Sequence, residues 1–175
     1  MAVLFGAGNA LAAVIPTHRQ CTVEIKNDCR SYCLINPSVC LTSGGCSKPL
    51  PLKLNPATRN KALFAKTPHT ARGTVGVFTY DLCKTGSIAT EKIAVMFSVP
   101  YDFNLYSNWY AVGVFSCTKS CDYDLYCEMY YNNESGFVRG KAADGSLQYK
   151  QRDVVIKASM SDTYTPYLKL KVKQI

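Results

Sequence analysis

The sequence has little of what most enzymes use for catalysis. It contains only two histidines, His18 and His69, and they are far apart in the chain. HExxH, G-x-S-x-G, P-loop and G-x-G-x-x-G motifs are all missing. The acidic pair Asp122 and Asp124 fits the first turn of a predicted helix, where the helix dipole favours anions. We therefore expect no enzymatic activity, no catalytic residues and no cofactor.

Long apolar runs and metal-type cysteine spacings are also missing. No apolar run reaches the roughly 18 residues of a membrane-spanning helix, which excludes a constitutive integral membrane protein. None of the nine cysteines forms a CxxC pair, so no metal site is expected. The thiols are either mostly reduced or joined in two or more disulfides. In an oxidising compartment, Cys29 with Cys33 or Cys117 with Cys121 could pair.

The chain is basic, but its charge and its aromatic residues are separated. The net charge is +8, made up of +7 over residues 19–72, −4 over 73–138 and +5 over 139–175. Seven of the twelve tyrosines and the only tryptophan fall within residues 101–131, inside the acidic middle. Nucleic-acid surfaces usually interleave aromatic rings with Lys and Arg, so a nucleic-acid partner is not expected.

The pattern along the chain predicts one β-rich domain. Residues 1–15 are apolar or small and end at Pro16, which predicts a surface-lying N-terminal helix, with a cleaved signal peptide as the alternative. Residues 1–20 form an N-terminal apolar segment, and 21–175 form a single β-sandwich. Period-2 alternation or Val, Ile, Phe and Tyr enrichment predicts strands at 21–25, 32–35, 39–41, 74–82, 92–99, 110–116, 154–160 and 168–172.

One segment follows a helical period instead. Thr118 or Ser120 can cap a helix that runs to about Tyr131. Tyr123, Tyr126 and Tyr130 then lie on one face, and Tyr131 lies beside them. These rings could pack as a tyrosine-rich core edge between helix and sheet. They could equally form a cage for a quaternary ammonium group, worth about 0.5–2 kcal/mol per ring.

Two runs of residues point to a known family. The first is FSVPYDFNLYSNWY at residues 97–110, and the second is LYCEMYY at residues 125–131. Together they closely resemble the actinoporins, the pore-forming cytolysins of sea anemones, and are closer still to actinoporin-like proteins outside anemones, for example in fish. The resemblance implies a mainly β fold, a β-sandwich flanked by one or two short α-helices. It also implies that residues 1–20 form a membrane-inserting helix.

The resemblance further implies which residues bind lipid. The headgroup positions that match the family are Ser43, Val75, Ser98, Pro100, Tyr106, Tyr126, Tyr130 and Tyr131. Leu105, Trp109 and Tyr110 match the exposed residues that enter the membrane interface, with Leu105 and Tyr110 standing where the family usually has Trp.

The implied partners are phosphocholine lipid membranes, containing sphingomyelin or phosphatidylcholine, and further copies of the chain, which would oligomerise on the membrane. The alternative is a lectin-like or lipid-binding module of the same fold without pore activity, for which carbohydrate would be a partner. The protein is expected to be secreted or soluble and to act at target cell membranes, with residence in the cytoplasm as the other location.

Overall fold

Strict alternation of apolar and polar residues produces the first strand, β1 (Gln20–Asp28). In the computed structural model, which describes residues 16–175, Cys21, Val23 and Ile25 are fully buried. The side chains between them are partly exposed on the opposite face. One face of this strand therefore joins a core and the other faces outward, as the sequence predicts.

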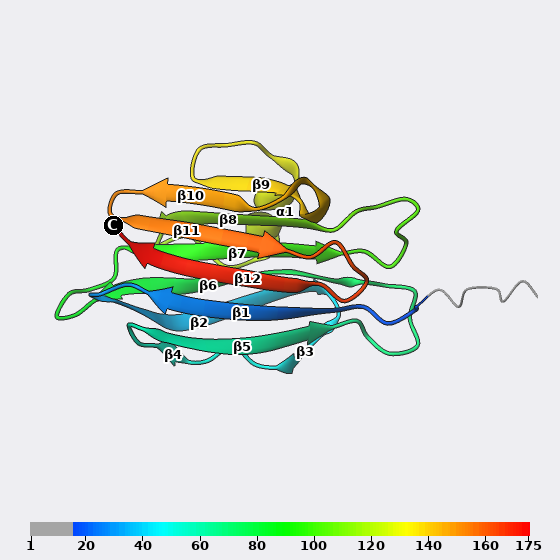
Figure 1. Ribbon diagram of the computed structural model, residues 1–175, viewed down its shortest axis with the longest axis horizontal. Coiled ribbons are helices and arrows are strands. Elements are labelled where there is room, and N and C mark those ends of the chain that lie inside the picture. Colours follow the sequence, from blue (N-terminus) through cyan, green and yellow to red (C-terminus); the bar gives the residue numbers. More distant parts are fainter. Residues whose placement is uncertain (1–15) are drawn as a thin grey trace, which may run out of the picture.

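Two six-stranded sheets pack face to face (Figure 1). The first has the order β10-β11-β12-β1-β5-β3, and the second has the order β4-β2-β6-β7-β8-β9. The first sheet contains β3 (Gly45–Lys48), β5 (Thr58–Ala65), β10 (Leu147–Gln151), β11 (Val154–Met160) and β12 (Tyr167–Gln174) beside β1. The second contains β2 (Tyr32–Ser43), β4 (Lys53–Leu54), β6 (Thr74–Lys84), β7 (Glu91–Val99), β8 (Trp109–Ser116) and β9 (Phe137–Lys141).

The main core lies between the sheets. Phe64 of β5 and Phe97 of β7 are both fully buried, and their ring centroids are 4.9 Å apart. All neighbouring strands pair antiparallel except β1 and β12, which run parallel. The β-sandwich expected from the sequence is thus confirmed.

A second, smaller core lies outside this sandwich, under the helix α1 (Tyr123–Tyr131). In Figure 1 the helix lies behind the second sheet, which is the far sheet in that view. Leu125 and Met129 are fully buried against the outer face of that sheet, together with Met96 of β7. A short 3-10 helix, η1 (Ala142–Asp144), follows β9.

Two local predictions need correction. The stretch predicted as two short strands is a single strand, β2, with a register shift between Ile35 and Ser38 where Asn36 adopts a φ of 52°. A bulge therefore absorbs the Asn-Pro sequence without ending the strand. The helix begins later than predicted, because the side chain of Asp122, and not of Thr118 or Ser120, caps it by accepting from the backbone N–H of Leu125 at 2.9 Å.

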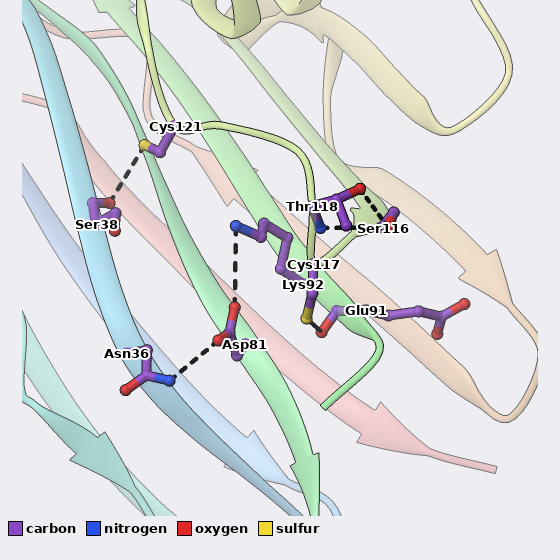
Figure 2. Close-up of polar contacts among 9 residues, drawn as sticks. All are labelled: Asn36, Ser38, Asp81, Glu91, Lys92, Ser116, Cys117, Thr118 and Cys121. Atoms are coloured by element: carbon purple, nitrogen blue, oxygen red, sulfur yellow. Dashed lines mark hydrogen bonds and ion pairs between the residues drawn. The ribbon is translucent and has the colours of Figure 1, made fainter. Parts of the chain in front are cut away.

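The segment that leads into α1 is fixed to the second sheet by two cysteines (Figure 2). The Cys117 thiol donates to the carbonyl of Glu91 at 3.1 Å, and the Cys121 thiol donates to the carbonyl of Ser38 at 3.5 Å. The two thiols point to different strands, β7 and β2. They act as weak donors that orient the segment, and they do not approach one another as disulfide partners.

All nine cysteines are free thiols, and one pair faces across a strand ladder. Cys33 of β2 and Cys83 of β6 are directly opposite in antiparallel register. Opposed Cα atoms in such a ladder are about 4.5–5.5 Å apart, which lies within the disulfide range. The residues of the pairings suggested by the sequence, Cys29 with Cys33 and Cys117 with Cys121, do not lie opposite one another in any strand ladder of residues 16–175.

We expect mild oxidation to join Cys33 to Cys83 before other pairs. Oxidised glutathione would accept the two electrons and two protons of the thiols and be released as two glutathione molecules. Peptide mapping by mass spectrometry under non-reducing conditions should recover the peptides of Cys33 and Cys83 as one linked species. A dominant link between Cys117 and Cys121 would contradict the register argument, and Cys83→Ser provides the control in which the expected species is lost.

The predictions for residues 1–15 concern a part of the chain outside the described residues. Within residues 16–175, no helix is long and apolar enough to cross a membrane. Figure 1 shows that the chain enters β1 at the end of the sandwich where the loop between β7 and β8 projects outward.

Candidate functional site

Three of the predicted headgroup residues lie in one row across the second sheet. Ser43 of β2 pairs with Val75 of β6, and Val75 pairs with Ser98 of β7. Ser98 in turn pairs with Trp109 of β8, and Trp109 pairs with Lys141 of β9. Directly opposed residues in an antiparallel sheet point to the same face. The register therefore collects side chains from five strands on the face that α1 covers.

The tyrosines of α1 form a stacked series beside this row. Tyr126 and Tyr130 stack with ring centroids 5.6 Å apart, and Tyr130 meets Tyr131 edge-on at 4.7 Å. Tyr126 is buried, whereas Tyr131 is 68% exposed. The series therefore runs from the second core out to the surface, as the spacing of these residues along a helix predicts. The core-edge interpretation holds for the inner ring, Tyr126, while the exposed outer ring of Tyr131 leaves the ammonium cage as a prediction.

Trp109 connects the row to the helix. Its ring meets Tyr130 at a centroid distance of 6.4 Å, and the guanidinium of Arg139 lies 4.2 Å from the indole. Lys141 places its ammonium 5.7 Å from the same ring. Arg139 also donates to the backbone carbonyl of Tyr130, which ties β9 to the last turn of α1. The site thus combines an aromatic wall with two cations.

Arg139 and Lys141 were not among the residues predicted for the site. Both are on β9, a strand that the sequence patterns did not predict. Strand alternation could have indicated them, because Phe137, Arg139 and Lys141 are spaced by two and Phe137 packs under α1. The signal was present in the sequence but depended on recognising the strand first.

The loop between β7 and β8 carries two exposed residues of the predicted set. Leu105 is 73% exposed and Tyr106 is 59% exposed. The loop is ordered by Asp102, whose carboxylate accepts from the N–H of Asn104 and whose carbonyl accepts from the N–H of Tyr106. At the start of the loop, Pro100 is half-buried, and its carbonyl accepts from the Arg19 guanidinium at 3.1 Å.

Tyr110 is the one predicted interface residue that the structure places elsewhere. It is fully buried in the main core, and its hydroxyl donates to the carbonyl of Gly145 at 2.5 Å. Successive residues of a strand point to opposite faces, so Trp109 and Tyr110 cannot both point outward from β8. The expected exposure of Tyr110 is therefore wrong, and only Trp109 remains from this pair on the helix-bearing face.

The phenols of Tyr126 and Tyr130 stay neutral at physiological pH. Burial raises the pKa of Tyr126 and of Tyr130, and the neighbouring phenols of Tyr131 and Tyr106 raise the pKa of Tyr130 further. The Ser43 hydroxyl donates to the carbonyl of Gly73 at 3.1 Å. The arrangement can hold a cation against the aromatic rings and an anion near Arg139. Within residues 16–175, no group of three or more His, Cys, Asp and Glu is placed to hold a metal ion.

Comparison with known proteins identifies relatives along almost the whole chain. The family model described as sea anemone cytotoxic protein matches residues 8–173. Bryoporin of Physcomitrium patens is 28% identical over 168 residues, which cover 95% of this chain and 90% of that protein.

Anemone toxins match over a shorter segment. DELTA-alicitoxin-Pse1b of Phyllodiscus semoni is 46% identical over 63 residues, covering 36% of this chain and 26% of the toxin. Among solved structures, the lipid binding protein Nakanori superposes with a TM-score of 0.68 and is 13% identical in sequence. The superposition covers 91% of this chain and 73% of the Nakanori chain. At that identity the likeness supports the fold alone.

Proposed function

Because the chain belongs to the sea anemone cytotoxic protein family, we propose that it is a membrane-binding, cytolysin-like protein that recognises phosphocholine headgroups of sphingomyelin and phosphatidylcholine. Copies of the chain would then oligomerise on the membrane and form a pore. The observation that carries the proposal is the stacked series of tyrosines from α1 beside the cross-strand row of the second sheet.

The chemistry of the headgroup matches the two halves of this site. A quaternary ammonium is attracted to the faces of aromatic rings, and Tyr106, Tyr130 and Tyr131 offer accessible rings. A phosphate needs donors or positive charge, and Arg139 and Lys141 lie within 6 Å of the Trp109 ring, at 4.2 and 5.7 Å. A zwitterion fits this combination better than a purely anionic lipid, which would leave the rings unused.

The hydroxyls of Ser43 and Ser98 are then secondary phosphate contacts. Ser98 is buried, and the Ser43 proton is already donated to Gly73. Either hydroxyl would have to rotate or exchange its partner to reach a phosphate. We therefore assign the main electrostatic attraction to Arg139 and Lys141.

Membrane attachment in this proposal uses the β7–β8 loop and the rings next to it. Leu105 and Tyr106 at the exposed loop, with Tyr131 on α1, present apolar surface with polar tips, which suits the boundary between headgroups and acyl chains. Two positions where the family usually has an exposed Trp contribute no aromatic ring to this surface, because Leu105 is aliphatic and Tyr110 is buried.

This aromatic surface, smaller than the family resemblance implies, favours a second candidate function. The second candidate is a lipid-binding or lectin-like module of the same fold without pore activity.

Vesicle flotation and dye release test both candidates in one experiment. The full chain is mixed with dye-loaded vesicles of phosphatidylcholine and sphingomyelin, and with matched vesicles of phosphatidylethanolamine and phosphatidylglycerol. We expect flotation and dye release only with the first composition. Flotation without release would support the module without a pore. Equal binding to both compositions would contradict headgroup recognition. If the chain floats with neither composition but binds immobilised glycans, and free sugars inhibit that binding, every lipid assignment is wrong.

A further inference from the structure

Most of the excess positive charge of the protein lies on a face that the lipid proposal does not use. The outward positions of β10, β11, β12, β1 and β5 carry eight basic and two acidic side chains, a net of +6, against +8 for the whole chain. This face belongs to the first sheet, the near one in Figure 1, and points away from α1. We call it the basic face.

The basic residues on this face are aligned across the strands. Lys157 of β11 pairs with Lys171 of β12, which pairs with Lys26 of β1, which pairs with Arg59 of β5. Adjacent strands are about 4.8 Å apart, so these four cations form a line about 14 Å long. Like charges directly opposite one another destabilise a sheet. A row of four therefore has a cost in stability that an anionic ligand would offset.

The two carboxylates on the face neutralise the row only in part. Asp28 lies 3.3 Å from the Lys171 ammonium and 4.0 Å from that of Lys26, the two inner members of the row. Within residues 16–175, Lys157 and Arg59 at its two ends have no ion pair within 4.0 Å. The row thus keeps its strongest attraction for anions at its ends, and it suits a ligand that extends along it.

A shallow hollow of about 360 Å³ marks the same place. It is lined by four lysines (Lys26, Lys157, Lys169 and Lys171), by one carboxylate, Glu24, and by the hydroxyl-bearing Ser146 and Ser159. Glu24 lies 3.9 Å from the Lys61 ammonium, so the lysines of the hollow still outnumber its single acidic group. Lysine ammonium groups act as point charges on flexible stems, which suits sulfate groups whose positions vary along a chain. Serine hydroxyls can hydrogen-bond to the hydroxyls of a sugar ring.

From the alignment of the cations and the hollow between them, we propose that the basic face binds a linear sulfated polysaccharide. A polysaccharide of this class carries repeated sulfates on an extended chain and can follow the line from Lys157 to Arg59. The proposal goes beyond the lipid function and does not depend on it, because the outer faces of the two sheets point in opposite directions.

Two other polyanions fit the face less well. An anionic bilayer that met the aromatic site near α1 could not also lie against the opposite sheet. Single-stranded nucleic acid stacks its bases on several aromatic rings interleaved with cations. The outward positions of these strands hold one ring, Tyr167, whose hydroxyl donates to the Glu24 carboxylate at 2.6 Å.

Chromatography on immobilised heparin tests the proposal with the full chain. We expect retention at 0.15 M salt and elution at higher salt, with no retention on fully desulfated heparin. Lys157→Gln with Lys171→Gln should reduce the slope of log affinity against log salt concentration by about two, because each ionic contact that forms on binding releases about one counterion and the variant forms two contacts fewer. The matched control is Lys53→Gln with Lys84→Gln, which removes the same charge outside the basic face.

The outcomes separate the possible ligands. A loss of heparin retention confined to the Lys157 and Lys171 variant supports the proposal, and this variant should bind sphingomyelin vesicles to the same extent as the unchanged chain. Equal losses in both double variants would show a general charge effect and overturn it. Binding to phosphatidylserine vesicles or to immobilised DNA that is as strong as binding to heparin would also overturn the proposal, provided that this binding also falls in the Lys157 and Lys171 variant. Circular dichroism checks that both variants remain folded.

Discussion

Replacing Tyr130 and Tyr131 together by alanine is expected to reduce flotation with sphingomyelin vesicles strongly. Each ring in contact with a quaternary ammonium contributes about 0.5–2 kcal/mol, and about 1.4 kcal/mol corresponds to a tenfold change in affinity. Loss of both rings, about 1–4 kcal/mol together, should therefore weaken binding by about fivefold to several hundredfold. Tyr131 is exposed and Tyr130 is half-buried, so the change leaves Leu125 and Met129 in place under the helix.

Tyr123→Ala is the matched control for this result. Tyr123 is on the same helix and is 54% exposed, but it lies at the far end of the stacked series and outside the predicted headgroup set. The control should keep its membrane binding. If the control loses binding as strongly as the double variant, or if the double variant floats as well as the unchanged chain, the assignment of the ammonium to Tyr130 and Tyr131 is wrong.

Phe97→Ala should produce the largest loss of stability. The Phe97 ring is fully buried and contacts Phe64 of the opposite sheet at 4.9 Å between centroids. Removing a buried phenylalanine side chain costs about 3–5 kcal/mol, a large fraction of the 5–15 kcal/mol that typically stabilises a domain. Chemical denaturation should show a lower midpoint with a similar slope.

Leu105→Ala provides the comparison for Phe97→Ala. Leu105 is exposed on the β7–β8 loop, so its removal should change the free energy of unfolding by no more than about 0.5 kcal/mol. It should nevertheless weaken membrane attachment in the proposed function. A large loss of stability in the Leu105 variant would mean that the loop packs more tightly than its exposure indicates.

The sequence predicts the parts of the fold whose periodicity is strong. The alternation of Cys21, Val23 and Ile25 fixes the inward face of β1, and the clean alternation at the C-terminal end does the same for β12. The strands β5, β9 and β10 escape prediction. β9 and β10 have only five residues each with few of them fully buried, and the first four residues of β5 are all exposed. Their pairing partners stabilise them, and partners far away in the chain leave no mark in a local window.

The candidate site shows the same division between local and distant information. The helical spacing of Tyr126 and Tyr130 is local, so their common face could be predicted. The contact of Arg139 with Trp109, 30 residues apart in the chain, depends on the pairing of β8 with β9 and could not be predicted from local spacing. Tyr110 is an instructive error, because the family resemblance suggested exposure where strand alternation alone would have placed the side chain inside.

The position of β12 has a consequence for the order in which the molecule can assemble. In chain order β12 is the last described strand, yet it lies between β11 and β1 in the middle of its sheet and pairs parallel with β1. On the ribosome, β1 and β5 can pair early, but β10 and β11 can join them only after residues 167–174 have been synthesised. Completion of the first sheet, and with it the basic face, therefore follows the synthesis of all the other described strands, and the part of the second sheet's inner face that β10, β11 and β12 cover stays open until then.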